Sequence, residues 1–205
     1  MDYTKLASEE SVERAAAALK TKNVEPIMVR DRAEALAKIK ELIPQGASVM
    51  NGSSRTLEEI GFVDYLKEGK HGWNNFHEKI LEEKDKAKAS ALRKQATLSE
   101  YYLGSVHGLA ETGEFVFGSN TGSQMPHIVF SSPNLIFVVG TQKVVPTLAD
   151  ALKRLEEYVV LREDENLIQK YNVHTNLSKE LIFRYENPMM GRKVRMILVP
   201  EKLGF

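Results

Sequence analysis

Three short polar turns in the sequence carry residue types that bind small anions. The first is Asn51-Gly52-Ser53-Ser54, which follows an apolar run and precedes a helical pattern. Glycine lets a ligand approach the backbone, and N–H groups and hydroxyls at the start of a helix suit a phosphate or a carboxylate. The same residues are ordinary turn and helix-capping residues, so a purely structural role is the competing interpretation.

The second polar turn, Ala110-Glu111-Thr112-Gly113, places a carboxylate between two apolar runs of β type. A charge at a strand end beside a tight glycine turn costs desolvation free energy unless it is paired or used. Glu111 is therefore the best candidate for a catalytic carboxylate. The competing interpretation is a salt bridge, or hydrogen bonds to neighbouring N–H groups.

The third polar turn extends from Gly118 to Gln124 and contains no hydrophobic side chain. Its candidate ligand-binding residues are Gly118, Ser119, Asn120, Thr121, Gly122 and Ser123. Their N–H groups and hydroxyls can cradle an anion, although the lysine and glycine spacing of a P-loop is absent. Because ligands of open α/β sheets bind at the carboxyl ends of the strands, we expect all three turns at one edge of a sheet.

Other chemistries lack their residue patterns. The chain has no cysteine, which excludes disulfides, thiolate zinc sites, Cys-ligated iron–sulfur clusters and a cysteine nucleophile. Its 5 histidines have no H-x-H or H-E-x-x-H spacing, so we expect no metal site. Neither a G-x-S-x-G elbow nor a G-x-G-x-x-G turn after a strand is present. We therefore expect no covalently bound cofactor and an unidentified small anion as ligand.

The apolar pattern predicts the elements that position these turns. Helical spacing is expected at 4–22, 31–43, 55–66, 75–103 and 147–158, and strands at 24–29, 47–50, 106–110, 114–117, 127–130, 135–139, 181–184 and 194–199. The continuous apolar run LIFVV is typical of a strand buried on both faces of a parallel sheet. The fold class is thus α/β, with a mostly parallel sheet flanked by helices and antiparallel strands in the C-terminal half.

Two charged segments have less specific patterns. Residues 75–103 are expected to form one long charged helix over a sheet face, with a partner-binding helix as the alternative. The basic cluster Arg184, Arg192, Lys193 and Arg195 suggests a solvated edge hairpin, because edge strands use basic residues against aggregation. An exposed sheet edge and the long helix together suggest a homodimer.

Length and charge set the broad class. The 205 residues are expected to form a single domain, with 1–23 as a helical N-terminal extension. The 28 basic and 28 acidic residues give zero net charge, which argues against non-specific nucleic-acid binding. No secretory signal is recognisable and no window holds the roughly 20 apolar residues that a membrane span needs. We expect a cytoplasmic protein without a membrane partner.

Four runs of the sequence resemble the LUD domain family (lactate utilisation, LutC/YkgG type). They are ASVMNGSSRTLEEIG, GLAETGEFVFGSN, LIFVVGTQKVVPTLADAL and ILVPEKLGF, and the resemblance covers most of residues 25–205. It implies a fold similar to the NagB/RpiA/CoA-transferase group. It also implies a ligand cleft lined by Gly52, Ser53, Ser54, Glu111, Thr112 and Gly113.

The resemblance implies two functions of different classes. The first is a LutC-like accessory subunit that works with separate iron–sulfur proteins in the oxidation of lactate to pyruvate. Since this chain has no cysteine, every Cys-ligated cluster would then lie on another chain. The alternative is an enzyme of the CoA-transferase or sugar-phosphate type, with Glu111 as catalytic carboxylate and N–H groups of 118–123 stabilising an oxyanion. Whether the chain is an enzyme stays open at this point.

Overall fold

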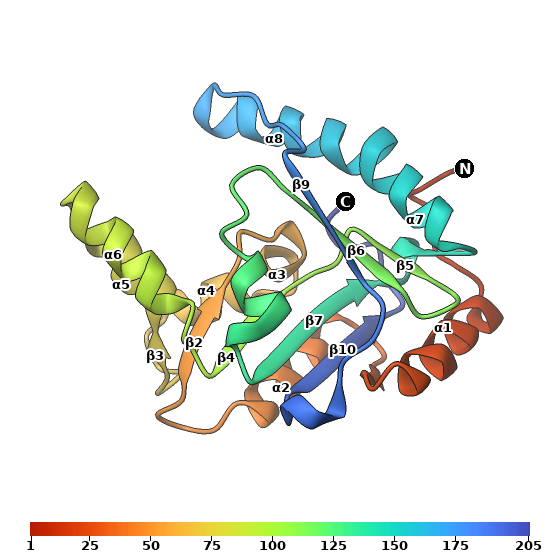
Figure 1. Ribbon diagram of the computed structural model, residues 1–205, viewed down its shortest axis with the longest axis horizontal. Coiled ribbons are helices and arrows are strands. Elements are labelled where there is room, and N and C mark those ends of the chain that lie inside the picture. The colour runs from red at the N-terminus through yellow and green to blue at the C-terminus, as the bar shows by residue number, and fades with distance from the viewer.

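The computed structural model describes all 205 residues and contains two β-sheets. The larger sheet has six strands, all parallel, in the order β1-β10-β7-β4-β2-β3. Their bounds are β1 Glu25–Met28, β2 Ser48–Asn51, β3 Asn74–Asn75, β4 Tyr101–Gly104, β7 Asn134–Gly140 and β10 Lys193–Val199. The predicted α/β class with a parallel sheet flanked by helices is confirmed (Figure 1).

The smaller sheet has four strands in the order β8-β5-β6-β9. Their bounds are β5 Gly108–Ala110, β6 Phe115–Ser119, β8 Val144–Val145 and β9 Lys179–Phe183. Strand β6 pairs antiparallel with both β5 and β9, whereas β5 and β8 are parallel. The expected antiparallel strands therefore form a second sheet of their own.

Alternating side chains of the strands join the layers into apolar cores. In β7, Leu135 and Phe137 face the core between the two sheets, while Ile136 and Val138 face the helices on the far side. The run LIFVV is thus buried on both faces, as its composition predicts. In the smaller sheet, Val116 of β6 packs toward the helices on its outer side.

Most of the helices cover the outer faces of the sheets, and one packs against the core between them (Figure 1). The helices are α1 Glu9–Thr21, α2 Arg32–Leu42, α3 Arg55–Glu59, α4 Phe62–Lys67, α5 Phe76–Glu82, α6 Lys86–Ala96, α7 Leu148–Arg154 and α8 Val160–Tyr171, with a π-helical segment Leu155–Val159 joining the last two. Asp31 caps α2 by accepting a hydrogen bond from the N–H of Glu34 at 2.8 Å, as its position predicts. None of the helices combines the length and the apolar character that crossing a membrane requires.

Helix α1 lies in the segment expected to be an N-terminal extension. Its residues Val12, Ala15 and Leu19 are buried in the same apolar core as Phe115 and Phe137. The helix therefore contributes to the core between the two sheets.

The prediction of a single long helix at 75–103 is wrong. Glu83 is extended, Asp85 caps a second helix, and the segment forms α5, α6 and then β4. Tyr102 and Leu103 of β4 are buried in the middle of the larger sheet, between β2 and β7. The sequence does not reveal this strand for two reasons. Four residues are too short to show a period of two, and the preceding charged residues 82–94 extend a helical pattern up to the strand.

The strand expected at 127–130 is also wrong, since His127–Ser131 is a π-helical turn. Pro126, which directly precedes this turn, has helical dihedral angles, and the proline ring restricts φ to a value that a helix also uses. His127 and Ile128 are buried, whereas Val129 and Phe130 are exposed. A run of four apolar residues does not distinguish a strand from a helical turn.

The solvated edge hairpin expected near the C-terminus does not form. Strands β9 and β10 belong to different sheets, and β10 lies between β1 and β7. Arg192 is buried: its Nη2 donates to the carbonyl of Ile128 at 2.7 Å, and its Nε lies 3.8 Å from the carboxylate of Glu186. This basic residue therefore holds the π-helical turn in place.

Candidate functional site

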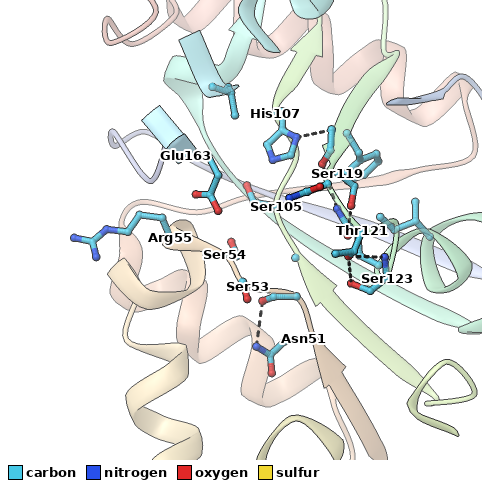
Figure 2. Close-up of a pocket in the computed structure, with 18 of the residues that line it drawn as sticks. Asn51, Ser53, Ser54, Arg55, Ser105, His107, Ser119, Thr121, Ser123 and Glu163 are labelled. Atoms are coloured by element: carbon cyan, nitrogen blue, oxygen red, sulfur yellow. Dashed lines mark hydrogen bonds between the residues drawn. The ribbon is translucent and has the colours of Figure 1, made fainter. Parts of the chain in front are cut away.

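A cleft of about 520 Å³ opens where the carboxyl ends of β2, β4 and β6 meet α5 and α8. The predicted ligand-binding residues that line it are Asn51, Gly52, Ser53, Ser54, Gly118, Ser119, Asn120, Thr121 and Ser123. Gly122 belongs to the same loop without lining the cleft. Two of the three polar turns therefore come together, one from each side of the cleft (Figure 2).

The turn after β2 is tightly constrained. A Cβ atom at Gly52 would lie 2.6 Å from the hydroxyl of Tyr102, so any larger residue here forces the Tyr102 ring or the turn to shift. The ring of Tyr102 is buried and stacks on His127 with a centroid distance of 4.6 Å. Asn51 is buried, and its Oδ1 has no hydrogen-bond partner. An unsatisfied acceptor at a cleft wall is costly unless a ligand or water meets it.

The loop after β6 satisfies many of its own polar groups. Ser119 Oγ donates to Gln124 Oε1 at 2.9 Å and accepts from the N–H of Gly122 at 2.8 Å. Thr121 Oγ1 donates to Ser123 Oγ at 3.1 Å. These bonds stiffen the loop and leave fewer hydroxyls for a ligand than the sequence suggests.

Lys143, a residue without a role in the sequence-based prediction, reaches the cleft from a 3₁₀ turn after β7. It is only 2% exposed. Its Nζ donates to Thr56 Oγ1 and to Ser105 Oγ, both at 3.0 Å, and it forms no salt bridge. Burial lowers the pKa of Lys143 well below its usual value, and the positive charge of Arg154 adds to this, while Glu59 acts in the opposite direction.

The sequence contains a signal for this lysine. Lys143 follows the buried strand LIFVVG within three residues, at the carboxyl end where ligands of parallel sheets bind. A basic residue placed there between apolar runs costs desolvation free energy unless it is paired or used, which is the argument that also singles out Glu111. The signal is weak because the sequence does not tell whether a salt-bridge partner will be present.

His107 also lines the cleft (Figure 2), close enough to Lys143 for the two groups to interact electrostatically. Its Nδ1 accepts a hydrogen bond from the N–H of Gly118 at 2.7 Å, so Nε2 carries the hydrogen of the neutral ring. Burial lowers the pKa of His107 to about 3, helped by the charges of Lys143 and Arg154. The ring is therefore a neutral hydrogen-bond donor at any pH near neutrality.

Arg154 adds a second buried basic group behind this wall. Its side chain is 0% exposed, Nη1 donates to the backbone carbonyl of His107, and Nε and Nη2 have no partner. The guanidinium lies 5.3 Å from the ring centre of Tyr158, and burial lowers its pKa to about 10. Like Lys143, Arg154 has no carboxylate partner, so the electrostatic potential of this region favours an anion.

Glu163 of α8 faces the turn after β2 from across the cleft (Figure 2). It is half-buried and accepts a hydrogen bond from Asn166 at 3.1 Å. Burial raises the pKa of Glu163 above its usual value. The cleft therefore combines the basic residue Lys143, with Arg154 behind it, and a carboxyl group that protonates more readily than an exposed glutamate.

Glu111 lies outside this cleft. The antiparallel hairpin of β5 and β6 sends residues 111–114 to the end opposite the 118–124 loop, so the expectation that all three turns share one edge is wrong. Glu111 accepts hydrogen bonds from Arg14 at 2.6 Å and from Ser11, both on α1, in a separate depression of about 250 Å³. Thr112 bonds to Glu114, and neither it nor Gly113 lines the cleft.

The environment of Glu111 is that of a paired surface carboxylate. Hydrogen bonding to Arg14 lowers the pKa of Glu111, which weakens it as a proton acceptor. The competing interpretation from the sequence, a salt bridge, describes this geometry. Its role as a catalytic carboxylate stays a prediction that the contacts do not support.

No group of three or more His, Asp or Glu side chains is placed to hold a metal ion. The polar groups that line the site include instead an amine, hydroxyls, imidazoles, amide groups and the single carboxyl group of Glu163. Such donors bind carboxylates, phosphates and polar carbonyl compounds.

A parallel sheet with a second, mixed sheet and a polar cleft at the carboxyl ends of the strands defines an α/β domain with a candidate binding site. The family model of the LUD domain matches residues 12–181, and the chain therefore belongs to the LUD domain family, a family related to lactate utilisation. The predicted family is confirmed.

Among solved structures, the chain is similar to a crystal structure of a DUF162 family protein from Deinococcus radiodurans. The two have a TM-score of 0.56 and 12% sequence identity, over 95% of this chain and 98% of the other. At this identity the likeness shows a shared fold. None of the curated protein sequences compared matches the chain.

Proposed function

We propose that this LUD domain protein is a LutC-like accessory subunit of lactate utilisation that binds a small organic anion in its cleft. The observation that carries the proposal is Lys143, a buried amine at the cleft whose hydrogen-bond partners are two hydroxyls and no carboxylate. An anion docked beside Lys143 supplies the missing counter-charge to its protonated form.

The surroundings of Lys143 favour a carboxylate or similar oxyanion. Hydroxyls of the turn after β2, the Nε2–H of His107 and the nearby charge of Arg154 all interact favourably with negative charge. The raised pKa of Glu163 limits repulsion from the one carboxyl group that faces the same space. A volume of about 520 Å³ accommodates an anion well above the size of lactate.

A ligand screen by thermal unfolding tests the binding. Lactate, pyruvate, longer oxo acids and phosphate are added singly to the purified protein, and one organic anion is expected to raise its stability. Binding to the folded state alone stabilises by about 2.7 kcal/mol at a hundredfold excess over Kd. Lys143→Met is expected to remove the shift, while the same change at the exposed Lys153 leaves it intact. Equal shifts in both variants, or none in the wild type, would refute the site.

The accessory role is tested separately in native cells. Because the chain has no cysteine, Cys-ligated iron–sulfur centres for lactate oxidation must be supplied by partner chains. Affinity purification of the tagged protein is expected to recover such subunits. Recovery of the chain alone, together with normal growth on lactate after its deletion, contradicts the role.

A further inference from the structure

We propose that Lys143 is a nucleophilic amine that captures the carbonyl group of an oxo acid as a reversible imine. The inference deepens the proposed anion binding and rests on it, since the carboxylate of the oxo acid occupies the anion site beside Lys143. It adds a covalent step and a ligand class that simple anion binding does not require.

The hydrogen bonds of Lys143 leave its lone pair free. Thr56 Oγ1 donates its own hydrogen to the carbonyl of Leu203 at 3.2 Å, and Ser105 Oγ donates to that of Val106 at 3.4 Å. Both hydroxyl oxygens therefore accept from Lys143, at 3.0 Å each. A neutral amine has two N–H groups, and both are used in this way. The remaining tetrahedral position of Nζ is the lone pair, on a side chain that lines the cleft.

The charges around Nζ favour the uncharged amine when the cleft is empty. Lys143 is 2% exposed, and Arg154 contributes an unpaired positive charge nearby. The one acidic group that acts on it, Glu59, is already engaged by Arg55 and by the N–H of Gly204. The pKa of Lys143 is accordingly far below that of an exposed lysine. Burial and a neighbouring cation are the two conditions that activate lysine as a nucleophile.

The reaction conserves oxidation state and needs no co-reactant. The Nζ lone pair forms a C–N bond to the carbonyl carbon while the C=O π electrons move to oxygen, which takes up the proton that nitrogen loses. The carbinolamine then expels its hydroxyl with a second proton from nitrogen, as water, and leaves the C=N bond. The hydroxyls of Thr56 and Ser105 can relay these protons, and the neutral His107 can donate to the oxygen. Addition of water reverses every step.

The cleft explains why an oxo acid fits better than a plain aldehyde. The imine nitrogen becomes positively charged when protonated, and the adjoining carboxylate then supplies the counter-charge that this buried position lacks. The hydroxyls of Ser53 and Ser54 line the cleft just before Thr56, the residue that bonds to Lys143, and they can meet the oxygens of this carboxylate. The volume of about 520 Å³ leaves room for a side chain longer than the methyl group of pyruvate.

Reductive trapping of the wild-type protein tests the imine directly. The full chain is incubated at pH 7 with cyanoborohydride and pyruvate, 2-oxobutyrate or 2-oxoglutarate, and peptide mass spectrometry locates the reduced adduct. Lys143 is expected to be modified at least tenfold faster than Lys153 by one of these acids, since exposed lysines are protonated at this pH. Lys143→Arg, which replaces the nucleophilic amine with a guanidinium, is expected to remove the adduct, and Lys153→Arg to retain it.

Lactate separates this inference from the proposed binding. It has a hydroxyl in place of the carbonyl, so it is expected to compete with trapping without being trapped itself. Stabilisation by organic anions without an adduct at Lys143 overturns the imine and leaves the proposed binding standing. Adducts spread evenly over surface lysines also overturn it. An adduct confined to Lys143 supports the imine, with or without stabilisation by a hydroxy acid. The absence of both an adduct and any stabilisation refutes both proposals.

Discussion

Two ionisable residues, Glu111 and Lys143, both follow a strand, and their surroundings differ in one decisive respect. Glu111 lies 2.6 Å from the Arg14 guanidinium near the surface, and its pKa is lowered. Lys143 is buried at a cleft, bonds only to hydroxyls, and its pKa is lowered by burial. The carboxylate that stands out in the sequence is satisfied within the fold. Lys143 has no carboxylate partner within the fold, so an anion can pair with its protonated form, and this makes the cleft the better candidate site.

Breaking a charge pair that is buried is expected to have the largest effect on stability. Arg192→Met removes the partner of Glu186, which is 5% exposed, and also the hydrogen bond to the carbonyl of Ile128. An uncompensated buried charge costs about 3 kcal/mol. Urea denaturation is expected to show that loss, and Glu186→Gln in the same background is expected to recover part of it. A change below 1 kcal/mol would mean that this pair resembles the exposed Glu111 pair.

Filling the turn after β2 is expected to cost about 2 kcal/mol. In Gly52→Ala the new Cβ meets the hydroxyl of Tyr102, whose ring is held against His127. Anion binding is expected to fall as well, because the turn and Lys143 line the same cleft. Adding Tyr102→Phe removes the clashing atom, and chemical denaturation of the double variant is expected to show most of the stability restored. If the single variant is fully stable and binds normally, the turn does not form the cleft wall described here.

The pH dependence of anion binding shows whether Lys143 or Glu111 takes up the proton that accompanies binding. Because the pKa of free Lys143 is lowered, binding of an anion to the protonated form takes up a proton, and affinity rises as pH falls through the range above that pKa. The slope is up to about tenfold per pH unit, or 1.4 kcal/mol. Calorimetric titration at several pH values is expected to show this slope in wild type and in Glu111→Gln. A slope that vanishes in Glu111→Gln would transfer the proton linkage to the carboxylate.

The smallest effect is expected for Glu111→Gln on stability itself. Its partner Arg14 is 55% exposed, and such pairs contribute little. Since the folded-state pKa of Glu111 is lowered, its contribution is present above the unfolded-state pKa and is lost as pH falls through the folded-state value. Thermal unfolding of the variant is expected to match wild type at acidic pH and to differ slightly at neutral pH. Loss of anion binding in this variant would favour the catalytic role predicted from the sequence.

Much of the framework is predictable from local patterns. The alternation of LIFVV, the cap at Asp31 and the apolar run before Asn51 each act within a few residues, and each element forms where the pattern indicates. The local pattern does not predict the strand at Tyr101–Gly104 or the π-helical turn at His127. Both are short, and their conformation is fixed by burial against distant segments.

The α/β class, the family, the absence of thiol chemistry and the polar turns at 51–54 and 118–124 all follow from the sequence alone. These depend on composition and on contacts between near neighbours in the chain. The tertiary structure decided which turns meet, because the antiparallel β5–β6 hairpin sends Glu111 away from the 118–124 loop. It also decided which ionisable group has an oppositely charged partner. Arg14 is 97 residues from Glu111, and the two hydroxyls at Lys143 come from helix α3 and from the residue after β4, so only the folded chain distinguishes the paired group from the unpaired one.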